Sequence, residues 1–241
     1  QRNRRGRQRT ARARGACAEW SAVQAPAPGA SRSEDSLFAP HVSVTRTLFR
    51  CASAPNGAGK SSTFRVLATL QPKFQGQAYV CGLDVLRQPQ KVRDVMGFVP
   101  DFFGVYEDLT SLEYLHFFAA AYRIPTAKRK GTIDDVLTLT DMTHKAHSPV
   151  DGLSRGMKQR LALARVLLHD PKVLLLDEPS SGLDPRARIE MRELLKALRE
   201  MGKTILISSH ILSELAQLCT RIGIIELGRM VAEGSLNEIY R

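Results

Sequence analysis

An uninterrupted aliphatic run followed by two acids limits, more than any other feature, how this chain can fold. Residues Val173 to Leu176 are all aliphatic, and Asp177 and Glu178 follow directly. A short apolar run of this kind is typical of a parallel strand that is covered on both faces. Open α/β sheets bind ligands at the carboxyl ends of their strands, so the two acids stand where a functional site can form. The run therefore predicts an α/β domain with a mostly parallel sheet.

Strand and helix patterns alternate through the sequence from residue 55 onward, which is typical of an α/β domain. We expect strands near 77–80, 97–99, 204–207, 222–225 and 229–232, and helices near 61–70, 90–94, 154–169, 185–202 and 212–218. The range 112–139 predicts helices that break at Pro125 and again at the basic run 128–130. A helical block at about 102–165 interrupts the alternation, and we interpret it as a helical subdomain.

The first fifth of the chain differs in composition from the rest. It holds ten arginines and three acids within residues 1–50, of 35 basic and 24 acidic residues in a chain of net charge +11. A stretch rich in Ala, Pro, Gly and Ser follows at 21–33, and such composition buries little apolar surface. We therefore predict a basic, disordered segment over 1–53, with a short strand near 42–44, and a folded domain over 54–241. A solvated tail is the favoured interpretation of the arginines, and an arm for nucleic acid or anionic lipid is the alternative.

Apolar runs and cysteines limit the cellular setting. The longest aliphatic run has four residues, against the ~20 that a membrane-spanning helix needs, so we expect the chain to cross no bilayer by itself. Four widely spaced cysteines form no C-x-x-C pair: Cys17, Cys51, Cys81 and Cys219. This spacing predicts neither a zinc site nor a disulfide framework, and it favours a reducing compartment.

A glycine-rich loop precedes the predicted helix at 61–70. The residues APNGAGKSS nearly match G-x-x-x-x-G-K-[ST], and glycines let backbone N–H groups line an anion nest at a helix N-terminus. Lys60 can reach phosphate oxygens and the Ser61 hydroxyl can ligate Mg²⁺. Alanine stands where the pattern has its first glycine, which costs on the order of 1 kcal/mol if that position needs a positive φ. The predicted phosphate-binding residues are Ala54, Pro55, Asn56, Gly57, Ala58, Gly59, Lys60, Ser61 and Ser62.

Downstream residues supply the other groups that phosphoryl transfer requires. Asp177 is placed to hold Mg²⁺ through water, and Glu178 to orient an attacking water. His210 directly follows the strand predicted at 204–207, and its place at the same sheet edge favours a functional role. Ser154 is a candidate N-cap, and the free N–H groups of the helix that it begins form a second anion site.

These residues together resemble the nucleotide-binding subunit of an ATP-binding cassette (ABC) transporter, over residues 55–241. PNGAGKSS is similar to the Walker A loop, LSRGMKQR to the signature usually written LSGGQ, LLLDEPSSGLD to Walker B and the D-loop, and SSH to the switch-histidine segment. PDFFGVYEDLT and LSRGMKQRLALAR resemble a bacterial exporter-type branch.

The resemblance implies a P-loop NTPase fold and a homodimer or heterodimer of ATP-binding subunits with ATP between them. It implies ATP and Mg²⁺ as ligands, and separate integral membrane permease subunits that place the chain at the cytoplasmic face of the cell membrane. Glu178 would be the general base, His210 would contact the γ-phosphate, and Asp184 of the D-loop would link the two sites. Residues that would cover the partner's nucleotide are Leu153, Ser154, Arg155, Gly156 and Met157, and residues that would hold the metal are Ser61, Asp177 and Asp101.

The sequence departs from the family pattern in three places. Asp101 stands where the Q-loop usually has glutamine, and Arg155 and Met157 replace a glycine and the glutamine of the signature. Residues 1–53 match neither the usual first strands nor the aromatic residue that stacks on adenine. One hypothesis for that segment is a wrong reading frame or a mis-assigned start.

Two alternative functions stay open on the sequence. The first is a soluble ABC ATPase that acts on ribosomes, DNA repair or cluster assembly, although nucleic acid is the less favoured partner. The second is a nucleotide-binding module with little turnover, because the family's usual first strands are missing from the sequence.

Overall fold

In the part of the chain that the structure describes, the larger of two β-sheets forms the centre of the fold. The computed structural model describes residues 42–44, 50–53, 59–101, 104, 108–211, 217–227 and 229–239. The sheet has the order β5-β6-β7-β2-β8-β9. Its strands are β5 (Met96–Val99), β6 (Val173–Asp177), β7 (Thr204–Ser209), β2 (Arg50–Ser53), β8 (Arg221–Glu226) and β9 (Arg229–Gly234). Every neighbouring pair is parallel except β8 and β9. The predicted α/β fold with a mostly parallel sheet is confirmed.

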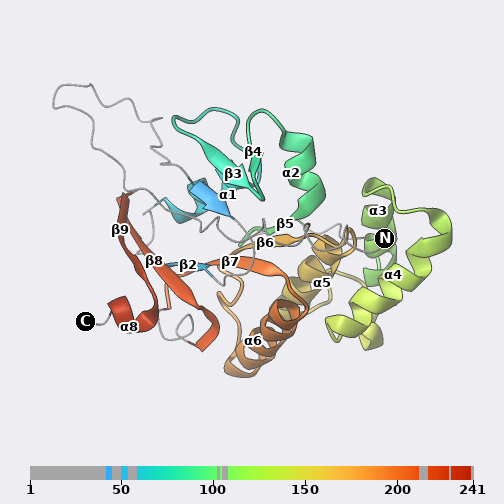
Figure 1. Ribbon diagram of the computed structural model, residues 1–241. Helices are drawn as coiled ribbons and strands as arrows, with labels where there is room; N and C mark the ends of the chain where they lie inside the picture. The colour runs from blue at the N-terminus through green and yellow to red at the C-terminus, as the bar shows by residue number, and fades with distance from the viewer. Residues whose placement is uncertain are drawn as a thin grey trace, which may run out of the picture.

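Three short strands form a second sheet. β1 (Val42–Val44) pairs in parallel with β3 (Ala78–Val80), which pairs antiparallel with β4 (Leu83–Asp84). The short strand predicted near 42–44 is therefore present. In Figure 1 this sheet lies with α2 on the side of the larger sheet away from α5 and α6.

Helices cover both faces of the larger sheet and form a separate group at one end of it (Figure 1). They are α1 (Lys60–Leu67), α2 (Pro89–Val95), α3 (Ser111–Ala121), α4 (Thr126–Leu139), α5 (Arg155–Leu167), α6 (Pro185–Glu200) and α8 (Leu236–Ile239), with a 3₁₀ turn η1 (Thr143–Lys145). Pro125 is the N-cap of α4, as the predicted break requires. The second predicted break is wrong: residues 128–130 lie inside α4, because lysine and arginine are good helix formers.

Alternate residues of β6 divide the apolar interior between two clusters. Leu174 and Leu176 pack in one cluster with residues of α3, α4, α5 and α6. Val173 and Leu175 pack in the other with residues of α1, β3 and α2. Successive side chains of a strand point to opposite faces, so a strand that is aliphatic at every position must be covered on both. All five residues of β6 are buried, which is the environment that the aliphatic run predicted.

β2 lies in the middle of the larger sheet, between β7 and β8. These four residues fall in the segment predicted to be disordered, and for 50–53 that expectation is wrong. The segment RCAS lacks the aliphatic pattern of a buried strand. Its backbone nevertheless pairs with a strand on each side, so it belongs to the sheet. Residues 1–41, 45–49 and 54–58, and most of the helix predicted at 212–218, lie outside the described residues.

Two further findings concern the membrane and the cysteines. Within the part of the chain that the structure describes, no helix combines the length and the apolar character that crossing a bilayer requires.

Cys219 is disulfide-bonded, whereas its spacing in the sequence predicted no disulfide. Disulfides form between cysteines that the fold brings together, so distance along the chain is a weak guide to them.

Candidate active site

The predicted phosphate loop ends where α1 begins. Gly59 is the N-cap residue, with a φ of 96° that favours glycine, and Lys60 is the first residue of the helix. Lys60 is 6% exposed, and its Nζ lies 3.5 Å from Oε1 of Glu178. Ser61 and Ser62 follow in the first turn of α1. The loop residues 54–58 lie outside the described residues, so the strain expected at Ala54 stays a prediction.

The carboxyl ends of β6 and β7 bring Asp177 and Ser208 side by side. The two residues are register partners in this parallel pair, and both are buried. The Ser208 hydroxyl donates a hydrogen bond to Oδ1 of Asp177. A buried carboxylate needs such donors, because burial without them carries a large desolvation cost.

Glu178 joins the lysine to the histidine. Its backbone has a φ of 49°, which is strained for a residue other than glycine. Its backbone N–H donates to the Ser208 carbonyl at 3.2 Å and to the Ser208 hydroxyl at 2.9 Å, and these bonds hold the strained turn. One carboxylate oxygen faces Lys60, and the other accepts a hydrogen bond from Nδ1 of His210 at 2.8 Å. The hydrogen is assigned to Nδ1 because an ionised carboxylate only accepts.

Asp101 lies close enough to these acids to feel their charge. It follows β5 by two residues, at the same carboxyl edge of the sheet. Burial raises the pKa of the Asp101 carboxyl above its usual range; the Arg155 guanidinium opposes that rise, and Asp177 and Glu178 add to it. Nη2 of Arg155 lies 3.7 Å from Oδ1 of Asp101. The predicted metal-binding and catalytic acids therefore gather in one region.

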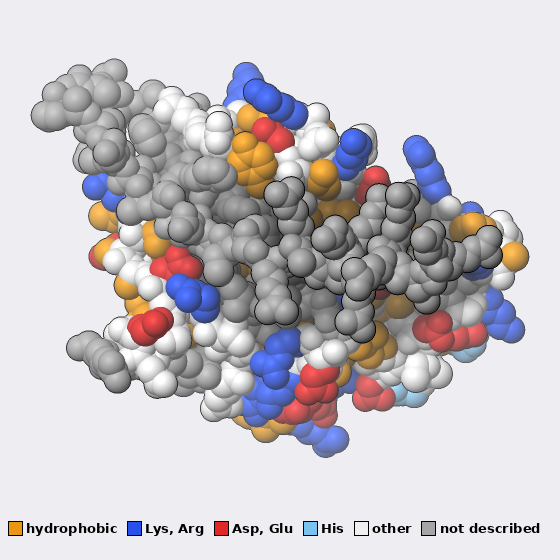
Figure 2. Space-filling model, in the orientation of Figure 1, with side chains coloured by type: hydrophobic (Ala, Val, Ile, Leu, Met, Phe, Trp, Pro, Cys, Tyr) orange, Lys and Arg blue, Asp and Glu red, His pale blue; other side chains and the backbone are white. Residues whose placement is uncertain are grey.

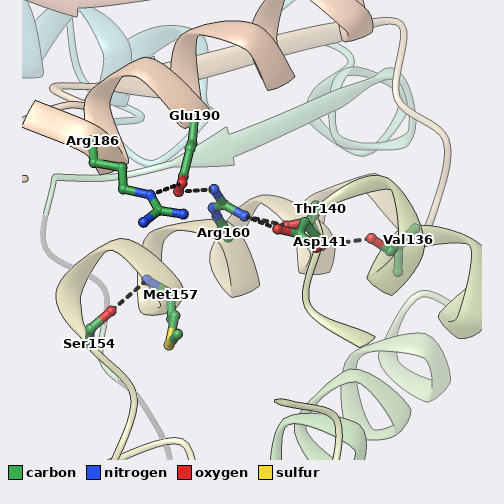
Figure 3. Close-up of polar contacts among 8 residues, drawn as sticks. All are labelled: Val136, Thr140, Asp141, Ser154, Met157, Arg160, Arg186 and Glu190. Atoms are coloured by element: carbon green, nitrogen blue, oxygen red, sulfur yellow. Dashed lines mark hydrogen bonds and ion pairs between the residues drawn. The ribbon is translucent and has the colours of Figure 1, made fainter. Parts of the chain in front are cut away.

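The segments that resemble the signature and the D-loop each provide a helix cap. The Ser154 hydroxyl accepts from the Met157 N–H at 3.3 Å at the start of α5 (Figure 3), and Oδ1 of Asp184 accepts from the Ala187 N–H at 2.9 Å at the start of α6. A Cβ placed on Gly156 would lie 3.2 Å from the Cβ of Ala187, so the first turns of the two helices are tightly packed. Leu153 is buried just before α5.

Ser208 is a residue of this region whose role the sequence did not predict, although it belongs to the segment SSH. The available signal was its position: parallel strands that both end in polar residues bring those residues together at one edge. Pairing of β6 directly with β7 could not be deduced, since these strands are separated by α6 in the sequence.

The assembled groups are those that phosphoryl transfer uses. They comprise a buried ammonium group at a helix N-terminus, a carboxylate that can accept a proton, an imidazole bonded to that carboxylate, and a buried acid beside them. Lysine can neutralise phosphate charge, and a carboxylate near it can position or deprotonate water.

Known proteins match the chain both in sequence and in structure. A sequence model of the family described as "ABC transporter" matches residues 54–181, which is more than half of the chain. The relatives include "Nod factor export ATP-binding protein I" from Burkholderia orbicola (strain AU 1054), 41% identical over 75% of this chain and 60% of the relative. Another is "Uncharacterized ABC transporter ATP-binding protein YhcH" from Bacillus subtilis (strain 168), 40% identical over 73% of this chain and 57% of the relative. The chain thus spans less than two thirds of these relatives' own length.

Solved structures agree. "Structure of ATP binding subunit of ABC transporter" superposes with a TM-score of 0.72 and 29% identity, covering 82% of each chain. "Structure of cbiO1 from clostridium perfringens: Part of the ABC transporter complex cbiONQ" gives a TM-score of 0.68 and 27% identity, covering 81% of this chain and 80% of that one. With the family's sequence pattern, fold and site groups all present, the chain belongs to the ABC transporter family of ATP-binding proteins.

Proposed function

We propose that this chain binds ATP and hydrolyses it to ADP and phosphate. The observation that carries the proposal is the contact chain Lys60–Glu178–His210 at the carboxyl edge of the sheet. A cation, a carboxylate that can accept a proton and an imidazole that contact one another support the binding and hydrolysis of a single phosphate ligand. Relatives named as ATP-binding proteins of transporters support the same activity.

In the proposed reaction, the residues at 54–62 and the N-terminus of α1 hold the phosphates, and Lys60 offsets their charge. Glu178 accepts a proton from a water molecule as the water oxygen bonds to the γ-phosphorus. The bond between that phosphorus and the bridging oxygen breaks, and ADP leaves with both electrons of the bond. His210 orients the Glu178 carboxylate through Nδ1, and its Nε2 is available to the transferred phosphoryl group.

The oxygen groups near the site suit Mg²⁺. Hydroxyl and carboxylate oxygens are its preferred protein ligands, and it usually takes one or two carboxylates together with substrate phosphates. Ser61, Asp177 and Asp101 are the proposed donors, directly or through water. The ion would supply positive charge that stabilises the transferred phosphoryl group.

Two copies of the chain, or this chain and a related one, form the proposed working unit. The N-terminus of α5, with Leu153, Ser154, Arg155, Gly156 and Met157, would cover the partner's ATP, and Asp184 would link the two sites. We propose that the dimer drives transport by separate membrane-spanning subunits at the cytoplasmic face of the membrane. Support comes from the relatives' names, one in Nod factor export and one in the complex cbiONQ.

The low-turnover alternative rested on missing first strands. β2 occupies the place of the strand before the phosphate loop, paired on both sides, which removes part of that argument. The soluble alternative, with an arm for nucleic acid, calls for a basic surface. On the face in Figure 2, blue basic and red acidic side chains are interspersed over the described surface. The relatives' names support the transport ATPase, which we favour.

Phosphate release at saturating Mg²⁺·ATP tests the catalytic half of the proposal. Glu178→Gln keeps the size of the side chain but removes its basicity, so kcat should fall at least about 100-fold while ATP still binds. Glu193→Gln, an exposed glutamate on α6, serves as the matched control and should retain the wild-type rate. Equal rates for the wild-type chain and Glu178→Gln would remove the role proposed for Glu178.

Co-purification from detergent extract tests the transport half. The tagged chain should retain an integral membrane protein through washes at high salt, and mass spectrometry should identify it as a multi-span subunit. Recovery of RNA or DNA, with binding that weakens steeply as salt rises, would favour the soluble alternative instead.

A further inference from the structure

Arg155 contacts two segments that lie far from it in the sequence. It is the first residue of α5, and its guanidinium forms the ion pair with Asp101, 54 positions earlier. The same group lies against Gly182: a Cβ built on that glycine would be 2.7 Å from both Cζ and Nη1 of Arg155. The guanidinium therefore fills the space that any side chain at position 182 would need.

The turn beneath the guanidinium connects Glu178 to α6. The Ser181 N–H donates to the Glu178 carbonyl at 3.0 Å, and Gly182 has a φ of 65°, which favours glycine. Asp184 then caps α6. Any movement of Gly182 therefore also moves the segment that connects Glu178 to α6. The Arg155 guanidinium lies directly against Gly182 in that segment.

Asp101 marks the other end of the contact. It follows β5 at the carboxyl edge, where Asp177, Glu178 and His210 exert their charge on it. Position 101 and position 155 are also two of the places where the sequence departs from the family pattern. In the fold these two departures meet as an anion and a cation.

We propose that Arg155 is a positioning residue that ties the loop at Asp101 to the turn at Gly182 within one chain, and that Arg155 and Asp101 act as a matched pair. The effect on ATP hydrolysis rests on the proposed function, but the contact itself does not. Loss of either partner loosens the same connection, so loss of both adds little.

The strength of this coupling comes from placement rather than from charge alone. Both side chains are more than half exposed, at 59% and 51%, and an exposed ion pair in isolation contributes little. The guanidinium already lies against Gly182, and its planar fork loses less side-chain entropy than an ammonium group when it pairs with a carboxylate. A lysine at 155 could keep the charge but would lack the planar group that contacts Gly182.

Hydrogen exchange of the intact chain tests the pair without any need for activity. Asp101→Asn and Arg155→Ala should each speed exchange of the amides at 180–184, by about fivefold, and the double variant should exchange no faster than Arg155→Ala alone. The exchange rate at 180–184 in Arg155→Lys should lie between the rates in the wild type and in Arg155→Ala. Arg87→Ala, which removes an exposed arginine 3.8 Å from Asp84, is the matched control and should leave exchange at 180–184 unchanged.

A second comparison isolates the packing on Gly182. Gly182→Ala introduces a Cβ into the guanidinium and also strains the backbone, whereas in an Arg155→Ala background only the strain remains. Gly182→Ala should therefore speed amide exchange at 180–184 less in the Arg155→Ala chain than in the wild-type chain. An equal increase in exchange in both chains would contradict the packing contact.

Kinetics add a readout that a loss of general stability would not reproduce. Arg155→Ala should lower kcat about fivefold at saturating ATP, and Arg155→Lys should lower it less, because lysine keeps the charge but not the planar group. If Asp101→Asn leaves exchange at 180–184 unchanged, or if the two single effects multiply in the double variant, the pair proposal is wrong even though ATP is hydrolysed. If the chain hydrolyses no ATP but the exchange effects appear, the pair stands and the proposed function fails.

Discussion

Ser208 organises the site at the level of single residues. Its hydroxyl donates to Asp177 and accepts from the backbone N–H of Glu178, and its carbonyl accepts from the same N–H. One side chain thereby fixes both acids, including the strained backbone at Glu178. Ser208 contacts no reacting atom in our proposal, and its role is to position groups that do.

Ser208→Ala should therefore affect both stability and rate. Loss of a buried hydrogen bond to a charged group should cost about 2 kcal/mol of the free energy of unfolding, measured by urea titration. Because Glu178 loses a bond that holds its backbone, kcat for ATP should also fall by at least about tenfold.

Ser111→Ala is the control for that prediction. Ser111 is also fully buried, but its hydroxyl bonds the Ser148 carbonyl at 3.4 Å in the helical region. It should lose some stability and keep the wild-type kcat. A Ser208→Ala chain with unchanged kcat would show that Asp177 and Glu178 do not depend on this hydroxyl.

Two glycines with opposite surroundings test the packing of elements. Gly97 lies on β5, where an added Cβ would be 3.0 Å from the Cβ of Val166 on α5 and 3.1 Å from Leu174. Gly131 lies within α4, where an added Cβ meets nothing within 4 Å. Gly97→Ala should therefore destabilise the fold by about 1–3 kcal/mol through overpacking. Gly131→Ala should stabilise it by about 0.5–1 kcal/mol, since alanine has the higher helix propensity. Chemical denaturation measures the free energy of unfolding of both variants. If both substitutions stabilised the fold, or both destabilised it, the packing described here would be contradicted.

Arg160 connects three helices, as Figure 3 shows. It belongs to α5, and its side chain is 12% exposed. One nitrogen donates to the Thr140 carbonyl at 3.4 Å and to Asp141 at 3.0 Å at the end of α4, and another donates to Glu190 on α6. The signature helix is thereby joined to the helical region on one side and to the helix after the D-loop on the other.

Arg160→Gln should lower the free energy of unfolding by about 1–2 kcal/mol. The loss of a buried charged donor is costly, but Asp141 and Glu190 are exposed enough for water to compensate in part. Arg186→Gln removes the exposed arginine that also pairs with Glu190, and as the control it should cost less than about 0.5 kcal/mol. Urea titration measures the free energy of unfolding of the two variants. Equal losses in Arg160→Gln and Arg186→Gln would mean that the contacts of Arg160 between the helices do not stabilise the fold.

For the whole molecule, the sequence predicted the parts whose signals are local. The aliphatic run 173–176 predicted a strand buried on both faces, and β6 is one. Asp184 followed by Pro185 predicted the start of α6, and the cap bond to Ala187 is present. The order of motifs predicted that Lys60, Glu178 and His210 serve one site; Glu178 contacts both other side chains, and their roles stay predictions.

The rest depended on contacts that a linear pattern does not contain. The segment RCAS gave no strand signal in the sequence, and its strand β2 is seen only in the pairing of its backbone with β7 and β8. The strained backbone of Glu178 follows from bonds to Ser208, thirty positions later. The contact between Arg155 and Gly182 needed the packing of α5 against the turn before α6.

The fate of the bound nucleotide during a single turnover tests whether Glu178 is the general base. Wild-type chain and Glu178→Gln are each mixed in excess with Mg²⁺·ATP, quenched over time, and analysed for ATP and ADP. We expect both chains to bind ATP alike, the wild type to convert it to ADP, and Glu178→Gln to retain it as ATP, with conversion at least about 100-fold slower. Conversion at the same rate in both chains, or no conversion in the wild type, would contradict this role of Glu178.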